Sequence, residues 1–132
     1  MRMRYDYTKP LLPGAVVCSK YNTFDGERKV GVFIVLYDEQ TDNSITEDKN
    51  VLALKLSTKG TCVSNYSMQI DRKLNNFLEC DCIACVSKIH TLHKKDQIYK
   101  IIGYLHPATY HKIYKIFMRF NNEMITQLTN NI

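Results

Sequence analysis

Val30–Tyr37 restricts the fold more than any other segment of the chain. It reads VGVFIVLY, a continuous apolar run that is rich in β-branched residues. A run of this length without a polar face is typical of a strand that is buried on both sides. The rest of the chain must therefore supply structure that covers both faces of the sheet to which this strand belongs.

Other short apolar runs follow through the first part of the chain. In addition to 30–37, we predict strands over 15–21, 51–56, 66–70, 80–89 and 99–104. The first of these follows Pro13-Gly14, which is a turn signal. Residues 38–50 are polar and carry five acidic side chains, which predicts a long acidic loop between two strands.

One helix follows the last strand. Pro107 suits the first helical position, where its missing N–H costs nothing. After it, apolar side chains recur at three- and four-residue spacing and form a single stripe. That stripe consists of Tyr110, Ile113, Tyr114, Phe117 and Met124. We predict a helix over 106–124 and a tail over 125–132.

This order of elements predicts a mainly β fold with a C-terminal helix (α+β), in which the helix packs on a small antiparallel barrel. A length of 132 residues predicts a single domain, with a basic N-terminal arm over 1–12 and the barrel over 13–105. No apolar run approaches the ~20 residues of a membrane helix. The N-terminus also lacks the apolar stretch of a secretory signal. We therefore predict a cytoplasmic protein without a membrane partner.

The cysteines agree with that compartment. There are five, an odd number, and three of them lie within Cys80–Cys85, which favours reduced thiols. Cys80, Cys82 and Cys85, together with His90 or His93, would give four soft ligands for zinc. Along a strand, however, alternation sends the third cysteine to the opposite face, and buried cysteine is an ordinary small hydrophobe. We predict no metal and no cofactor.

The charge is moderately basic. Eighteen Lys and Arg residues against thirteen acids give a formal net charge of +5. Because five of the acids gather in 38–50, the rest of the surface is more basic than this balance implies, and an anionic partner is expected. A solvated charged surface without such a partner is the alternative interpretation.

Several motifs, in order along residues 13–124, resemble the MazF/PemK family of ribonuclease toxins. Pro13–Val17 resembles the opening Gly-Asp-Val strand of the family, and Leu54–Thr58 resembles the strand that ends in its catalytic Thr or Ser. Cys82–Lys95 is similar to the long strand that runs into Gln-Ile-Arg-Thr-Leu-Asp-Lys-Lys, and Ile101–Leu105 continues the likeness. The resemblance implies an SH3-like barrel, a homodimer, and single-stranded RNA that lies in a groove at the dimer interface.

The chain departs from the family pattern at three positions. Arg28-Lys29-Val30-Gly31 stands where the family has Arg-Pro before the strand. Ala15 replaces the acidic residue after the first glycine, and His90 replaces the basic residue of the Ile-Arg-Thr-Leu motif. These changes bear on catalysis more than on the fold.

The resemblance also implies metal-free cleavage, in which the adjacent 2′-hydroxyl of the RNA is the nucleophile. Arg28 or Lys29 would hold the scissile phosphate, a task that suits the planar fork of arginine better. The hydroxyl of Ser57 or Thr58 would bind a phosphate oxygen, and His90 would act as acid or base. A solvated loop cation, a polar turn and a packed histidine are the alternatives at these positions.

RNA binding requires less than cleavage does. Basic grooves hold single strands, and aromatic side chains stack on the bases. Tyr21 and Phe24 flank the first loop and are candidates for stacking, while Lys59 and Lys88 are candidates for contact with the backbone. Packing within the strand is the alternative for Tyr21.

The sequence therefore supports three hypotheses. The first is a sequence-selective, metal-independent endoribonuclease (an mRNA interferase) of a toxin–antitoxin system, neutralised by an antitoxin protein with a flexible tail. The second is a catalytically inactive relative that binds nucleic acid or protein as a regulator, such as one carried on a mobile element. The third is a structural interaction module, for which the acidic loop is the positive sign.

Overall fold

In the part of the chain that the structure describes, a single antiparallel sheet and one C-terminal helix make up the fold. The computed structural model describes residues 7, 9–23, 25–38, 50–57 and 66–130. Six strands pair in the order β4-β5-β3-β2-β1-β6. Their bounds, with those of the helix, are β1 (Ala15–Asn22), β2 (Arg28–Asp38), β3 (Asn50–Ser57), β4 (Ser67–Ile70), β5 (Cys82–His93), β6 (Ile98–Tyr104) and α1 (Pro107–Asn130). The predicted α+β class, mainly β with a C-terminal helix, is confirmed.

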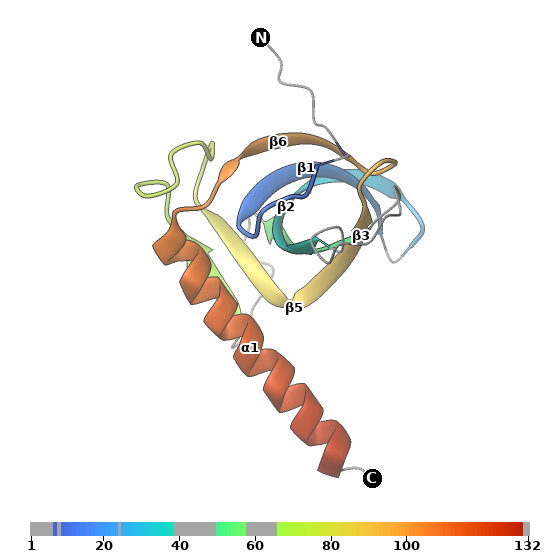
Figure 1. Ribbon diagram of the computed structural model, residues 1–132, viewed down its shortest axis with the longest axis vertical. Coiled ribbons are helices and arrows are strands. Elements are labelled where there is room, and N and C mark those ends of the chain that lie inside the picture. The colour runs from blue at the N-terminus through green and yellow to red at the C-terminus, as the bar shows by residue number, and fades with distance from the viewer. Residues whose placement is uncertain (1–6, 8, 24, 39–49, 58–65, 131–132) are drawn as a thin grey trace.

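The sheet curls strongly, so that it has an inner and an outer face (Figure 1). The inner face carries a buried cluster that includes Val17, Phe33 and Val35. The outer face carries a second cluster, to which Ile34 of β2 and Ile113 of α1 belong. Consecutive residues of β2 thus enter different clusters. This arrangement confirms burial on both sides for residues 33–36 of the predicted run, whereas Val30 at its start is exposed.

A sharp bend divides β5 into two halves (Figure 1). Leu54 of β3 pairs with Ile89, but Leu56 pairs with Ala84, so the register shifts between these two positions. The extra residues on β5 form a bulge, and a bulge bends the strand that contains it. The bend lets one half of β5 contribute to the outer cluster while the other half follows the curl toward the inner one.

The helix α1 packs on the sheet through its N-terminal part, up to Phe120. Thr109 and Ile113 are buried, whereas every residue over 121–130 is exposed. The predicted end at residue 124 is wrong, because the helix continues to Asn130. No glycine or proline lies in that stretch to terminate it. No helix within the described part of the chain is both long and apolar enough to cross a membrane.

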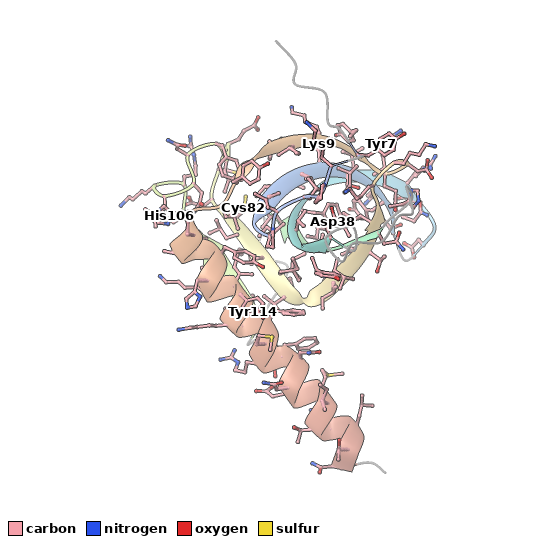
Figure 2. The ribbon with its side chains drawn as sticks, viewed as in Figure 1. Tyr7, Lys9, Asp38, Cys82, His106 and Tyr114 are labelled. Atoms are coloured by element: carbon pink, nitrogen blue, oxygen red, sulfur yellow. The ribbon has the colours of Figure 1, made fainter. Side chains whose placement is uncertain are left out.

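A buried ion pair joins two segments that are distant in sequence. The Nζ atom of Lys94 lies 2.7 Å from Oδ2 of Asp38, and both side chains are fully buried. Asp38 also accepts a hydrogen bond from the backbone N–H of Leu11, and Lys94 donates to the carbonyl oxygen of Lys9. Figure 2 shows Asp38 inside the curl of the sheet. The pair therefore holds the segment before β1 against the inner face.

The prediction that Asp38 belongs to the acidic loop is wrong. It is the last residue of β2 and Asn50 is the first of β3, while 39–49 lie outside the described residues. The prediction of reduced thiols is wrong for Cys85, which is disulfide-bonded. Cys18, Cys80 and Cys82 are free. Local sequence cannot show either contact, since each depends on which strands the fold brings together.

Candidate functional site

Four side chains from four strands meet on the inner face near one end of the sheet. We call Tyr21, Phe33, Lys55 and His90 the Tyr–Lys–His cluster. Lys55 pairs with Phe33 across β2 and β3, and His90 pairs with Ala53, two residues before Lys55. The three rings pack edge to face, with centroids 5.5 Å apart for Tyr21 and Phe33, 5.8 Å for Tyr21 and His90, and 5.2 Å for Phe33 and His90.

Lys55 supplies the positive charge of the cluster. Its Nζ atom lies 2.7 Å from the hydroxyl oxygen of Tyr21 and 4.6 Å from the centroid of the same ring. The ammonium therefore donates a hydrogen bond to the hydroxyl and keeps further N–H donors for another acceptor. Because Lys55 is only partly buried, a ligand at this end of the sheet can reach it.

Sequence reasoning missed Lys55, although the sequence carries a signal for it. In Leu54-Lys55-Leu56, a lysine interrupts an apolar strand. Strand alternation places it on the same face as Ala53, which is fully buried in the inner cluster. A lysine on the inward-facing side of a strand needs a partner or a function, because burial of an unpaired charge is costly.

Gly31 leaves room for the cluster. A Cβ atom at this position would lie 3.0 Å from Cε1 of Tyr21 and 3.2 Å from Cε2 of Phe33. Both distances are tighter than ordinary van der Waals contact, so a side chain here would displace the rings. Close packing of this kind is a common reason for glycine within a strand.

His90 is half-buried among these groups. Burial lowers the pKa of His90 below its ordinary value of 6.5, and the nearby positive charges of Lys55 and Lys88 lower it further. The imidazole is therefore neutral at pH 7, and its unprotonated nitrogen is able to accept a proton. This environment suits a general base.

The predicted phosphate-binding residues lie at the same end of neighbouring strands. Lys29 pairs with Tyr21 and shares its face of the sheet, whereas Arg28 pairs with Asn22 and falls on the opposite face. Both cations are exposed, and Lys29 lies 3.6 Å from the carboxylate of Glu27. Alternation thus brings Lys29 to the rim of the cluster and directs Arg28 away from it.

Ser57 ends β3 on the face that carries Lys55, two residues further along the strand. The β2–β3 register, extended by one pair beyond Val32 and Leu56, sets Ser57 beside Gly31. Lys88 is exposed and precedes His90 by two residues. Ser57, Lys29 and Lys88 therefore surround the cluster, whereas Phe24, Thr58 and Lys59 lie outside the described residues.

The structure corrects the prediction that the ring of Tyr21 stacks on an RNA base. Only 8% of this residue is exposed, and its ring belongs to the inner cluster. The packing alternative therefore holds for the ring, since a buried ring has no free face for a base. What the residue offers to a ligand is the hydroxyl that orients Lys55.

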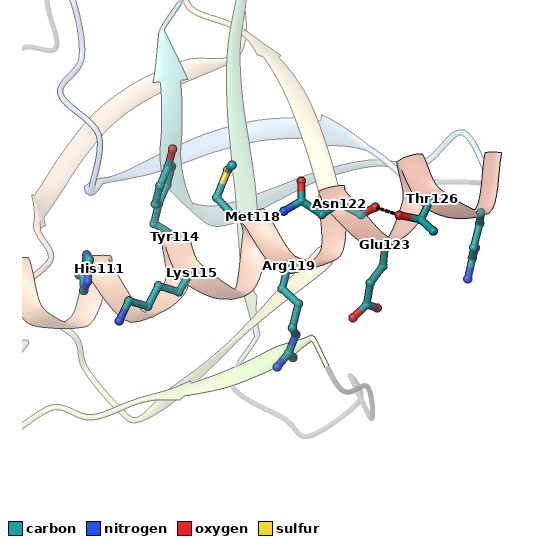
Figure 3. A pocket seen from close by; sticks show the side chains of 9 residues that line it. His111, Tyr114, Lys115, Met118, Arg119, Asn122, Glu123 and Thr126 are labelled. Atoms are coloured by element: carbon teal, nitrogen blue, oxygen red, sulfur yellow. Dashed lines mark hydrogen bonds between the residues drawn. The ribbon is translucent and has the colours of Figure 1, made fainter. Parts of the chain in front are cut away.

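A surface hollow on the C-terminal helix is not part of this site. It runs along one side of α1, and every residue that lines it belongs to that helix (Figure 3). Tyr114 and Met118 line it together with the charged residues Lys115 and Arg119. Since no second element forms a wall in the part of the chain that the structure describes, it is a helix surface rather than a cleft.

Over the described residues, no group of three or more His, Cys, Asp or Glu side chains has the geometry of a metal site. No protein-family model matches the chain, and no curated protein matches it. The function must therefore be inferred from the chemistry of the cluster.

Proposed function

We propose that this chain is a metal-independent endoribonuclease of the MazF/PemK type that cleaves single-stranded RNA at the Tyr–Lys–His cluster. The observation that carries the proposal is the pairing of a neutral, half-buried His90 with an ammonium that the Tyr21 hydroxyl holds in place. One group can remove a proton while the other stabilises negative charge. Cleavage of an RNA phosphodiester without a metal needs both.

The steps of the reaction are divided between His90 and Lys55. His90 removes the proton from the 2′-hydroxyl, whose oxygen then attacks the adjacent phosphorus atom. Lys55 stabilises the negative charge of the phosphorane and gives a proton to the departing 5′-oxygen. The products are a 2′,3′-cyclic phosphate and a 5′-hydroxyl end. Tyr21 is a positioning residue, because it acts by holding Lys55.

The surroundings of the cluster favour an anionic polymer. Lys29, Lys88 and Ser57 lie around it and offer donors to successive phosphates. The cation that the family supplies from its Arg-Pro pair comes, in this proposal, from Lys55 on the next strand. The strongly curled sheet with both faces covered supports an SH3-like barrel as the scaffold.

Two partners belong to the same proposal. The exposed second half of α1 carries large apolar side chains, namely Met124, Ile125 and Leu128, which suit contact with a protein. A second copy of the chain and an antitoxin with a flexible tail are the partners that the family resemblance implies. Single-stranded RNA is the substrate of the assembly that lacks the antitoxin.

The test is cleavage of a long unstructured RNA by the purified protein in the presence of EDTA. We expect wild-type protein to cut it and Lys55→Met to cut it about 10²–10³-fold more slowly, as for loss of one donor to a developing oxyanion. Lys115→Met, which removes an exposed lysine from α1, is the matched control and should keep the wild-type rate. RNA that wild-type protein binds but leaves intact would favour the inactive regulator instead.

A further inference from the structure

Three free thiols line one cavity on the outer face of the sheet, behind the strands that carry the Tyr–Lys–His cluster. Cys18, Cys80 and Cys82 contribute to this cavity of about 520 Å³. Cys18 of β1 lies in one transverse row with Val32 of β2 and Leu56 of β3, which form part of the apolar wall. The volume falls in the range of small-molecule sites, roughly 300–1,000 Å³.

The segment that carries the thiols is fixed in place. Phe77 lies against Gly103 of β6, where an added Cβ atom would come within 2.5 Å of the ring. Asn75 accepts a hydrogen bond from the backbone N–H of His106 and donates to the hydroxyl of Thr109 at the start of α1. These contacts of Phe77 and Asn75 anchor the segment before β5 to the C-terminal part of the chain. The cavity wall is therefore a built feature of the fold.

The two thiols of this segment differ in their surroundings. Cys80 is exposed, whereas Cys82 is buried and donates to the carbonyl oxygen of Cys80 over 3.3 Å. Only one residue separates Cys80 from Cys82 in the chain, and both residues line the cavity, so their thiols can come together. Burial raises the pKa of Cys82 to about 11, and the charges of Cys80 and Asp81 add to the effect.

We propose that Cys80 and Cys82 form a reactive dithiol that exchanges with a low-molecular-weight disulfide bound in this cavity. Cys80 is the attacking thiol, because it is accessible, and Cys82 is the resolving thiol. Lys100 and Glu79 also line the cavity, so a disulfide that carries both carboxylate and ammonium groups, such as oxidised glutathione, is the expected class of ligand. The inference does not depend on RNA cleavage.

Two steps balance the exchange. The thiolate of Cys80 attacks one sulfur of the disulfide, forms a mixed disulfide, and releases one thiolate that takes up a proton. Cys82 then loses its proton to solvent and attacks the Cys80 sulfur, which releases a second thiol and leaves a Cys80–Cys82 disulfide. The protein pair loses two electrons, and the small disulfide gains them.

Burial, the largest cause of the raised pKa of Cys82, remains when Cys80 is in a mixed disulfide, so the second step is slow at neutral pH. Only a small fraction of Cys82 is thiolate there, and thiolate is the attacking form. The mixed disulfide should therefore accumulate near pH 7 and convert to the internal disulfide as the pH rises.

The test treats full-length protein with oxidised glutathione and follows it by intact mass and peptide mapping. We expect one glutathionyl group on Cys80 at pH 7 and its replacement by a Cys80–Cys82 disulfide at pH 9.5. Cys82→Ser should keep the adduct at both pH values, and Cys80→Ser should slow modification by about tenfold or more, because the exposed thiolate is lost.

Cys18→Ser removes the third thiol of the cavity and leaves the pair intact, so the glutathionyl group should still map to Cys80 at pH 7. Thermal unfolding verifies that each variant is folded. Modification of Cys80→Ser at the wild-type rate, or an adduct that maps to Cys18, would overturn the proposal. So would a glutathionyl adduct on Cys80 that persists at pH 9.5 in wild-type protein.

Discussion

Replacement of Lys94 by methionine is expected to lower the free energy of unfolding by about 3–5 kcal/mol, the usual cost of breaking a buried ion pair. The Lys94 ammonium and the Asp38 carboxylate lie 2.7 Å apart with both side chains fully buried. Without Lys94, the carboxylate stays buried without its counter-ion. The link from Lys94 to the carbonyl oxygen of Lys9 is lost as well.

Urea-induced unfolding at pH 7 measures this loss. Lys95→Met is the matched control, because it makes the same substitution at the adjacent exposed position and should change stability by no more than about 0.5 kcal/mol. The double variant Asp38→Leu/Lys94→Met should recover part of the loss, since it removes both buried charges. Equal stability of Lys94→Met and Lys95→Met would show that the pair does not hold the fold together.

Replacement of His90 by alanine is expected to reduce kcat for RNA cleavage by about 10²–10⁴-fold, the range for loss of a general acid–base group. His90→Gln should lower kcat by a similar factor, because glutamine accepts no proton. Glutamine fills more of the space between the rings of Tyr21 and Phe33 than alanine does, so it tests the loss of the base with less loss of packing. His111→Ala removes an exposed histidine from α1 and serves as the control. A His90→Gln variant as fast as wild type would exclude the proposed base.

The pH profile of the same reaction follows from the pKa of His90. Burial, then Lys55 and Lys88, lower that pKa below its ordinary value of 6.5. The base must be deprotonated to act, and kcat/KM reports the pKa of the free enzyme, so the acid limb of kcat/KM should lie below pH 6.5. Lys88→Gln removes one of the positive charges and should move this limb to higher pH. A limb that moves to lower pH would contradict the assignment.

Strand positions could be predicted from the sequence because apolar alternation and continuous apolar runs are local signals. The run at 30–37 lies within β2, and the one at 51–56 lies within β3. The end of α1 was less predictable, since its exposed final turns have neither a terminating residue nor a packed stripe.

The site could be predicted only in part. His90, Lys29 and Ser57 were identified from motifs, and the structure brings them to one end of the inner face. Lys55 joins them through contacts across β1, β2, β3 and β5, and local sequence does not reveal those contacts. The same holds for Asp38, whose partner Lys94 is 56 positions away in the sequence.

The most direct test of the proposed active site compares an RNA oligonucleotide with the same oligonucleotide that carries one 2′-deoxynucleotide at the cut position, both in EDTA. Wild-type protein should convert the RNA to fragments with 2′,3′-cyclic phosphate and 5′-hydroxyl ends, and it should bind but not cut the deoxy form. Cleavage of both at equal rates, or of neither, would contradict a reaction in which His90 activates the 2′-hydroxyl.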